Sequence, residues 1–541
     1  MVHSAISVIA ASASLQARQE ALQRCIVTTE QMSDIEARVF AAGMPVAALM
    51  EKVGGLLTQW ICTHYPASQF RRVGVLVGPG HNGGDALVVA RELHLRGYEV
   101  MRYQPFTKLK ELTQGHARYA NCLNILAVER TQQLQHCDLL IDGLFGFGLT
   151  RPLVDKIAES VNQINSWTSP RVSIDLPSGI HTDTGAVLGT AIRATHTLCL
   201  GLWKRAFLQD NALDYLGKAE LIDIGLPLVD IQAVLGEEPK LQRITADFVR
   251  QALPLPRPAA THKYKQGHLL LIAGSRQYMG AAILAGLSAR ASGVGMLSVA
   301  VPESLRSLLI AQLPDALVVG CLEDETGAMA SLPESIDLNR YHAVACGPGL
   351  TMQGLPIVQQ VLACNCPLLL DADGLNSLAT LGTSSALRQR SAPTVLTPHL
   401  GEFKRLFPEL MQSANAEIPE SQIPDPINWA QTAAQQSGAI VLLKGARTVI
   451  AAPSGQAWLI PDSTSALARG GSGDVLTGLM GGLMAQRIVR NTELEPIVCS
   501  AAWWHAQAAL LAVQEKSALG VDASALIHYL ASVLQRELTS L

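Results

Sequence analysis

Residues 73–85 read VGVLVGPGHNGGD, and this stretch decides the fold of the N-terminal half. Its first five residues are an apolar run typical of a buried strand, and residues 78–83 place glycines at the spacing G-x-G-x-x-G. A helical segment then ends at Gly97, and a second strand-like run follows at residues 98–103. This order predicts a βαβ unit in a parallel sheet.

The glycine spacing alone is a weak indicator of function. Such glycines let backbone N–H groups approach a pyrophosphate at a helix N-terminus. An ordinary nicotinamide-dependent dehydrogenase also carries an Asp or Glu at the end of the next strand, where it binds the ribose. That strand ends here in MRYQ at residues 101–104. The sequence therefore disfavours a hydride-transferring enzyme.

Strand-like and helical runs alternate along the whole chain and predict α/β domains with largely parallel sheets. The 541 residues exceed the roughly 250–300 of a single core. A charged, proline-rich passage at residues 235–266 separates two halves that share no motif. We expect an N-terminal extension over residues 1–27, a Rossmann-like three-layer domain over 28–240 and a second α/β domain over 241–541.

Composition excludes several classes of partner. With 41 Lys and Arg against 45 Asp and Glu, the chain has no basic field for nucleic acid. The longest apolar candidate, residues 281–301, contains Arg290 and several Ser and Gly, so we expect no membrane span. Ten scattered cysteines with no zinc-like spacing indicate reduced thiols of a cytoplasmic protein. The first 25 residues favour a short helical extension over a transit peptide.

Polar side chains follow three strand-like runs of the first half. Asn82 and Asp85 follow the first, Asp142 follows the second, and Asp175 follows the third. In a doubly wound sheet these strand ends meet in one crevice, where oxygen ligands suit a hard cation and a buried carboxylate can act as acid or base. A single Asp of this kind more often caps a loop. Three at matched strand ends favour a site.

This half resembles the epimerase domain of the NAD(P)H-hydrate repair enzymes over residues 28–226. The resemblance implies a potassium ion held by Asn82, Asp142 and Ser178, and a substrate contact and acid–base role for Asp175. The chain departs from the usual family pattern at His81, Ala86 and Phe147. The residues implied to bind the hydrated nucleotide are His81, Asn82, Gly83, Gly84, Asp85, Gly146, Phe147, Gly148, Leu149, Thr150, Arg151, Pro152 and Asp175.

The second half carries GGSGD at residues 470–474, followed by a helical run with apolar residues at a spacing of three and four. The spacing predicts an amphipathic helix with one face packed inward. A glycine-rich helix N-terminus forms an anion hole for a transferred phosphate, and Asp474 can take a proton from an attacking hydroxyl. Close packing would explain the glycines but not Asp474. The signature resembles that of the ribokinase-like superfamily.

The order of motifs from about residue 244 onward is similar to the dehydratase domain of the same repair enzymes. The motifs are HKYKQGH at 262–268, GSRQYMGA at 274–281, GPGL at 347–350, DADGLN at 371–376, TPHLGEF at 397–403 and KGART at 444–448. The resemblance implies a hydrate pocket lined by Ala281, Gly349, His399 and Asp474. It implies nucleotide contacts by Lys444, Gly445, Ala446, Arg447, Thr448, Gly470, Gly471, Ser472 and Gly473.

We therefore expect a bifunctional enzyme that interconverts the R and S forms of NADHX and NADPHX and dehydrates the S form. The resemblance implies ADP with Mg²⁺ as co-substrate, and phosphorylation of the ring hydroxyl would turn hydroxide into a better leaving group. Fused enzymes of this type often form homo-oligomers. One alternative is a ribokinase-superfamily kinase of a vitamin or sugar. Another treats the N-terminal half as a noncatalytic binding module.

Overall fold

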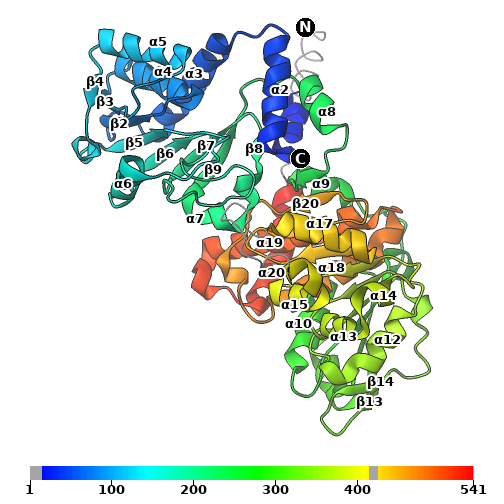
Figure 1. Ribbon diagram of the computed structural model, residues 1–541. Helices are drawn as coiled ribbons and strands as arrows, with labels where there is room; N and C mark the ends of the chain where they lie inside the picture. Colours follow the sequence, from blue (N-terminus) through cyan, green and yellow to red (C-terminus); the bar gives the residue numbers. More distant parts are fainter. Residues whose placement is uncertain (1–14, 413–424, 540–541) are drawn as a thin grey trace. The chain divides into compact units, whose positions relative to one another are not determined.

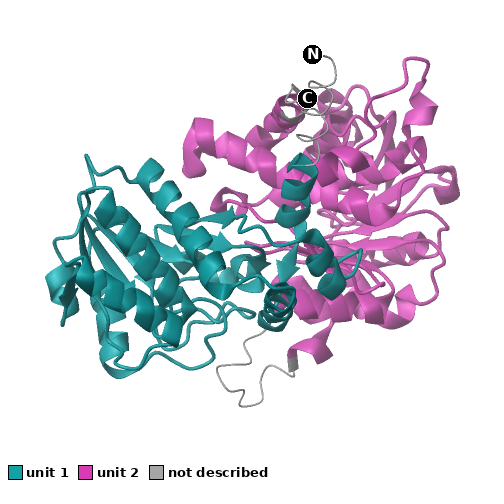
Figure 2. Cartoon of the chain, turned by 90° about the horizontal axis from the view of Figure 1, so that it is seen from above, with its two compact units in different colours: residues 1–239, 419–423 teal, residues 240–418, 424–541 magenta. Residues whose placement is uncertain are grey.

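The computed structural model describes residues 15–412 and 425–539 (Figure 1). Its described residues form two compact units that divide between Pro239 and Lys240 (Figure 2). We call them the N-terminal and the C-terminal unit. Each has its own parallel sheet and its own core, which confirms the α/β fold class predicted from the alternating apolar runs.

Within the described N-terminal unit, a seven-stranded sheet is parallel throughout. The predicted βαβ unit is confirmed as β2, α4 and β3. In spatial order the strands are β4 (Leu126–Val128), β3 (Glu99–Tyr103), β2 (Arg72–Val77), β5 (Leu139–Gly143), β6 (Arg171–Ile174), β7 (His196–Leu200) and β9 (Lys218–Ile222). A short parallel pair joins β1 (Ile26–Val27) to β8 (Trp203–Lys204).

Helices cover both faces of this sheet. Alternation along β2 sends Val73, Val75 and Val77 into a core with α2, α3, α4 and α5, and sends Leu76 into a second core with α6. The result is the expected three-layer domain (Figure 1). The helices are α2 (Thr29–Ala41), α3 (Val46–His64), α4 (His81–Leu95), α5 (Glu111–Cys122), α6 (Asp155–Asn165), α7 (Leu213–Leu216) and α8 (Leu228–Leu235).

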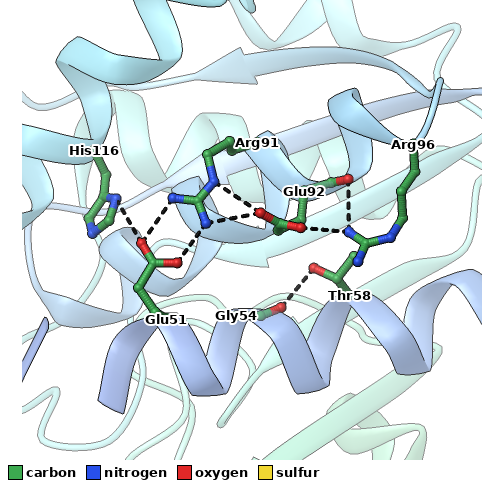
Figure 3. Close-up of polar contacts among 7 residues, drawn as sticks. All are labelled: Glu51, Gly54, Thr58, Arg91, Glu92, Arg96 and His116. Atoms are coloured by element: carbon green, nitrogen blue, oxygen red, sulfur yellow. Dashed lines mark hydrogen bonds and ion pairs between the residues drawn. The ribbon is translucent and has the colours of Figure 1, made fainter. Parts of the chain in front are cut away.

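Ion pairs on the outer side of this layer fasten α3, α4 and α5 together (Figure 3). The Arg91 guanidinium of α4 donates to both carboxylate oxygens of Glu51 on α3, at 2.9 and 2.6 Å, and also to Glu92. His116 of α5 lies 4.0 Å from Glu51. A bidentate pair of an arginine and a carboxylate fixes the orientation of the two side chains as well as their distance. The pair therefore fixes the position of α4 relative to α3.

The strand order reverses at β2, because the chain continues to β3 on one side and returns to β5 on the other. Loops that leave the carboxyl ends of β2 and β5 diverge at such a point and open a crevice there. In the C-terminal unit the strand order reverses in the same way, between β11 (His268–Ile272) and β15 (Ala343–Cys346). Topology alone therefore places one crevice in each unit.

Within the described C-terminal unit, the sheet has eleven strands and is parallel from β18 to β13; β14 is antiparallel to β13, β19 is antiparallel to β18 and β20, and the edge strand β10 is parallel to β20. In spatial order the strands are β10 (Leu241–Arg243), β20 (Ala457–Leu459), β19 (Val449–Ala451), β18 (Ile440–Leu443), β17 (Thr394–Leu396), β16 (Leu368–Leu370), β15 (Ala343–Cys346), β11 (His268–Ile272), β12 (Met296–Pro302), β13 (Leu317–Glu323) and β14 (Met329–Ser331).

The helices of this unit include a long C-terminal pair (Figure 1). They are α9 (Ala246–Ala252), α10 (Met279–Ala291), α11 (Arg306–Gln312), α12 (Leu355–Leu362), α13 (Asp373–Leu381), α14 (Thr383–Leu387), α15 (Leu400–Leu406), α16 (Pro408–Gln412), α17 (Pro426–Ser437), α18 (Ser472–Gln486), α19 (Leu494–Gly520) and α20 (Ala523–Thr539). By length and composition α19 could span a membrane, although the sequence analysis did not single it out. Of its most apolar 18 residues, 78% are buried inside the protein.

The prediction that α18 packs along one face only is wrong. Nearly every residue from Val475 to Gln486 is buried, because α18 lies between α10, α19 and strands β11 and β15. Glycines make this central position possible: a Cβ added at Gly478 would lie 1.9 Å from the carbonyl oxygen of Ala285 on α10. A helix buried on all sides carries no amphipathic signal in its sequence.

We predict that Gly478→Ala lowers the free energy of unfolding by about 1–3 kcal/mol or more, because α10 and α18 must separate to admit the methyl group. The matched control is Gly280→Ala on α10, where an added Cβ meets nothing within 4 Å. It should leave stability unchanged or raise it by up to about 1 kcal/mol. Calorimetry of the full chain measures both, and equal melting temperatures would contradict the packing argument.

Candidate active sites

A cavity of about 540 Å³ opens at the reversal point of the N-terminal sheet. Loops after β2, β5 and β6 form one wall, and apolar residues of α2 and α3 form the other. Of the sequence-predicted residues, the cavity brings together His81, Asn82, Asp85, Gly146, Phe147, Gly148, Leu149 and Asp175. The predicted residues Gly83, Gly84, Thr150, Arg151 and Pro152 are not in its lining.

Two predicted contact residues pack instead. A Cβ added at Gly83 would lie 2.0 Å from the carbonyl oxygen of Gly78, and one at Gly84 would meet the side chain of Met50. These glycines let α4 approach β2 and α3 closely, which is one of the known uses of a glycine in this fingerprint. By contrast Gly146 lies between two site residues, because its added Cβ would be 3.1 Å from Asn82 Oδ1 and 3.2 Å from Asp175 Oδ2.

Asp175 is fixed by donors on both carboxylate oxygens. Its Oδ1 accepts from Lys204 Nζ at 2.5 Å and from the backbone N–H of Leu200 at 3.2 Å, and its Oδ2 accepts from the N–H of Phe147 at 3.0 Å. The backbone of Asp175 has φ of 67°, in the left-handed region that non-glycine residues rarely occupy. Strain of this kind persists only where the surroundings enforce it.

Lys204 is the partner that sequence reasoning missed. Its side chain is fully buried, and Nζ also donates to the carbonyl oxygen of Leu200 at 2.6 Å. Burial lowers the pKa of Lys204, but the carboxylate of Asp175 more than offsets this, so its pKa lies above the ordinary value. The only available signal was a lysine inside the apolar run at residues 198–208, which matches no motif.

The predicted potassium ligands lie beside the cavity. Asp142 is buried, and its carboxylate accepts from Ser173 Oγ at 2.8 Å and from Ser178 at N and Oγ, at 2.9 and 2.6 Å. Burial raises the pKa of Asp142, partly offset by these donors. Asn82 Nδ2 is a buried atom with no hydrogen-bond partner among the described residues. Rotation of that carboxamide by 180° presents its oxygen at the same point.

This donor set fits a monovalent cation. It offers one carboxylate, a hydroxyl and a carboxamide, and the carbonyl oxygen of Phe145 lies 3.1 Å from Ser178 Oγ. Among the described residues, no group of three His, Cys, Asp or Glu side chains could hold a metal ion. A site of mostly neutral oxygens lacks the charge that a tight divalent site uses.

Two further acids line the cavity. Burial raises the pKa of Glu36 on α2 to about 7, with smaller effects from Lys204, Asp175 and Lys110. Burial also raises the pKa of Asp85 well above its ordinary value, and the neighbouring carboxylates of Asp175 and Glu36 add to the effect. No sequence pattern singles out Glu36, because this residue belongs to a helix outside the βαβ unit.

A second Lys–Asp ion pair lies in the C-terminal unit, between buried Asp371 and partly exposed Lys444. Lys444 follows β18 and its Nζ donates to Asp371 Oδ1, after β16, at 2.8 Å. Thr477 Oγ1 of α18 donates to Asp371 Oδ2 at 2.6 Å. Burial raises the pKa of Asp371, but Lys444 and these donors outweigh it, so the pKa lies below the ordinary value. Asp371 lies in the DADGLN motif, from which sequence reasoning derived no role for it.

Asp474 lies in the first turn of α18, close to this pair. A Cβ added at Gly473 would be 3.7 Å from both Asp371 Oδ2 and Lys444 Nζ, which places the helix N-terminus against the ion pair. Burial, with a smaller contribution from the neighbouring Asp371, raises the pKa of Asp474 to about 6, and Lys444 opposes the shift. The structure thus brings Asp474, Lys444 and the glycine-rich N-terminus together at one sheet edge.

The remaining predicted residues lie along the same edge. His399 is level with Lys444 in a parallel bridge and caps α15, accepting at Nδ1 from the N–H of Gly401 at 2.9 Å. Gly349 approaches Ala281, since its added Cβ would lie 3.1 Å from the Ala281 Cβ, after β15 and at the start of α10. Residues 445–448 form the turn from β18 to β19, directly after Lys444.

Comparisons with known proteins match both units. A family described as "NAD(P)H-hydrate dehydratase" matches residues 269–532, and one described as "YjeF-related protein N-terminus" matches residues 46–206. Proteins named bifunctional NAD(P)H-hydrate repair enzyme Nnr are similar: that of Synechocystis sp. is 56% identical over 94% of both chains, and that of Thermosynechococcus vestitus 52% over 95% of this chain and 98% of that one.

A solved structure is also similar to part of the chain. The ADP/ATP-dependent NAD(P)H-hydrate dehydratase from Bacillus subtilis, co-crystallized with ATP and Mg²⁺, is 35% identical. The match covers 54% of this chain and 97% of that one, with a TM-score of 0.45.

We predict that Lys204→Met lowers the unfolding free energy of the N-terminal unit by about 3–5 kcal/mol, because it leaves the Asp175 carboxylate buried without its counterion. Combining it with Asp175→Asn should recover part of the loss. The exposed Lys108→Met is the control, with an expected change within about 0.5 kcal/mol. Urea unfolding of the full chain, followed by hydrogen exchange at backbone amides, measures the unfolding free energy of each unit separately. Equal losses in the single and double variants would contradict the ion-pair explanation.

Proposed function

We propose that this chain, which belongs to the family of bifunctional NAD(P)H-hydrate repair enzymes, restores NADH and NADPH from NADHX and NADPHX with one site in each unit. The observation that carries the proposal is that each unit holds a pair of a lysine and a buried aspartate at the reversal point or carboxyl edge of its parallel sheet. Beside each pair lies an acid with a raised pKa. Two separate sites of this kind suit two successive reactions at one hydroxyl-bearing ring carbon.

In the N-terminal unit, the cavity would bind the hydrated nucleotide for epimerisation. The start of α4 offers backbone N–H groups and a positive helix end to the pyrophosphate, with His81 and Asn82 at its first positions. Asp175 would contact the hydrated ring as a fixed carboxylate. Asn82, Asp142 and Ser178 would hold K⁺, which would supply positive charge for binding the anionic nucleotide.

In the C-terminal unit, ADP would phosphorylate the ring hydroxyl of the S hydrate. Asp474 takes the hydroxyl proton while the oxygen attacks the terminal phosphorus, and AMP leaves with the electron pair. The glycine-rich N-terminus of α18 accommodates the transferred phosphoryl group. Phosphate then leaves the ring carbon as the adjacent carbon loses a proton, which yields NADH or NADPH. Bound Mg²⁺ would supply charge neutralisation on the nucleotide phosphates.

Lys444 differs from a free phosphate-binding lysine. Burial lowers its pKa, but Asp371 more than offsets this, and the ammonium is already engaged at 2.8 Å. Because one N–H of the Lys444 ammonium is directed at Asp371, the orientation of the other two N–H groups toward a phosphate is restricted. We therefore propose that Asp371 and Thr477 orient Lys444 toward the nucleotide, with Gly445, Ala446, Arg447 and Thr448 forming the adjoining turn.

The proposal is tested by recovery of absorbance at 340 nm from mixed R and S NADHX with Mg²⁺ and either ADP or ATP. We expect recovery of both epimers with ADP, and a loss of about 10²–10⁴-fold in Asp474→Asn. The exposed Glu334→Gln serves as control and should match wild type. No recovery with either nucleotide would overturn the proposal, and accumulation of a phosphorylated product would favour a small-molecule kinase.

The pH dependence follows from the base role of Asp474. Its pKa of about 6 is raised, so the active carboxylate is lost as the pH falls through that value. We expect kcat/KM for dehydration of purified S hydrate to fall about tenfold per unit well below pH 6, and to be level above it. A profile without this limb would contradict the assignment.

Potassium dependence is a separate prediction. Exchanging K⁺ for Li⁺ at constant ionic strength should slow epimerisation several-fold and lower the melting temperature of the N-terminal unit. Ser178→Ala should weaken both responses, whereas Ser166→Ala, which removes an exposed hydroxyl, should leave them unchanged. Identical melting in both salts would argue against the ion.

Location and assembly stay predictions. All ten cysteines have free thiols, which supports a reducing, cytoplasmic compartment. A homo-oligomer is expected, and sedimentation equilibrium would measure it.

A further inference from the structure

Epimerisation needs a group that gives and takes a proton at the hydroxyl of the hydrated ring. The resemblance assigns this role to Asp175, but both of its oxygens already accept hydrogen bonds, from Lys204 Nζ, Leu200 N–H and Phe147 N–H. Its side chain is only 4% exposed. Three donors therefore hold the Asp175 carboxylate, two of them on Oδ1, and only Oδ2 keeps an acceptor position open.

Glu36 has the opposite surroundings. It projects from α2 with Met32 and Phe40, spaced by four residues, so that the three side chains share one helix face and line the cavity. It is the acidic member of this face, and the neighbouring wall contributes Val46, Leu49, Met50 and Val53 from α3. Among the contacts found in the described structure, no hydrogen bond or ion pair engages the Glu36 carboxyl.

We propose that Glu36 is the acid–base residue of the epimerase site, acting directly on the ring hydroxyl of the bound hydrate. This inference rests on the proposed function of the N-terminal unit. The Glu36 carboxyl gives its proton to the hydroxyl, the C–O bond breaks with its electron pair on oxygen, and water leaves. The ring nitrogen lone pair forms a C=N bond, solvent water adds to the opposite face and loses its proton to bulk water, and bulk water reprotonates Glu36.

Charge in the cavity suits this step. The groups facing Glu36 are Asp175 and Lys204 from the sheet edge, Asp85 and His81 from α4, and Lys110 before α5. Burial raises the pKa of Glu36 to about 7, so at neutral pH both its acid and its base forms are populated. The Asp175 side chain would lie near the cationic ring that forms in this step. Lys204 and two backbone N–H groups hold that side chain in place.

The test measures conversion of purified R hydrate to S hydrate by the full-length protein, with the spontaneous rate subtracted. We expect Glu36→Gln to lower kcat by about 10²–10⁴-fold with KM within threefold of wild type. Glu36→Asp should restore part of kcat. The matched control is Asp34→Asn, which removes an exposed carboxyl from the same helix and should behave as wild type.

The pH profile separates an acid–base role from a structural one. Protonated Glu36 is the reactive form, so wild-type kcat should fall as the pH rises above about 7, and Glu36→Gln should lack this limb. ADP-driven dehydration of S hydrate by the same variants checks that the chain is folded. Wild-type protein that fails to epimerise would overturn the proposed function itself. Active wild type with an equally active Glu36→Gln would overturn only the role of Glu36.

Discussion

A lysine ammonium against a buried aspartate is the interaction on which both sites depend. Removing two such charges from water costs several kcal/mol for each, and only good geometry with further hydrogen bonds offsets this cost. The N-terminal pair has that support from the Leu200 carbonyl, and the C-terminal pair from Thr477. Each pair joins segments far apart in sequence. The sheet edge, its following loops and the pair therefore stabilise one another.

The pairs also divide the acids of each site into two kinds. Asp175 and Asp371 are each held in place by a lysine and by further hydrogen-bond donors. Glu36 and Asp474 lie in poorly solvated positions without such a partner, and burial raises the pKa of each toward neutrality. In many enzymes two acids of one site have surroundings that move their pKa values apart. One acid then stabilises charge and the other transfers protons.

How far the sequence predicts this arrangement depends on whether a signal is local. Strand–glycine–helix order and acids at strand ends are local patterns, and they located β2, α4, Asp142 and Asp175. Lys204 and Glu36 come from elements outside those patterns, and only the tertiary fold brings them to the cavity. The surroundings of α18 could not be predicted for the same reason. Neighbouring elements bury this helix on all sides, so its sequence has no separate apolar and polar faces. Gly83 and Gly84 obey the motif but serve packing.

The position of the titrating acid has a physical reason that holds in both units. Loops at the carboxyl ends of parallel strands are fixed by their neighbours, so a carboxylate there keeps its place and its donors. An acid that must change its protonation state needs fewer donors and an apolar wall, which a helix facing the crevice provides. Glu36 on α2 meets this requirement; Asp474, at the start of α18, is also helix-borne but lies close to Asp371 and Lys444. In each unit a helix-borne acid therefore lies beside an aspartate at the end of a strand.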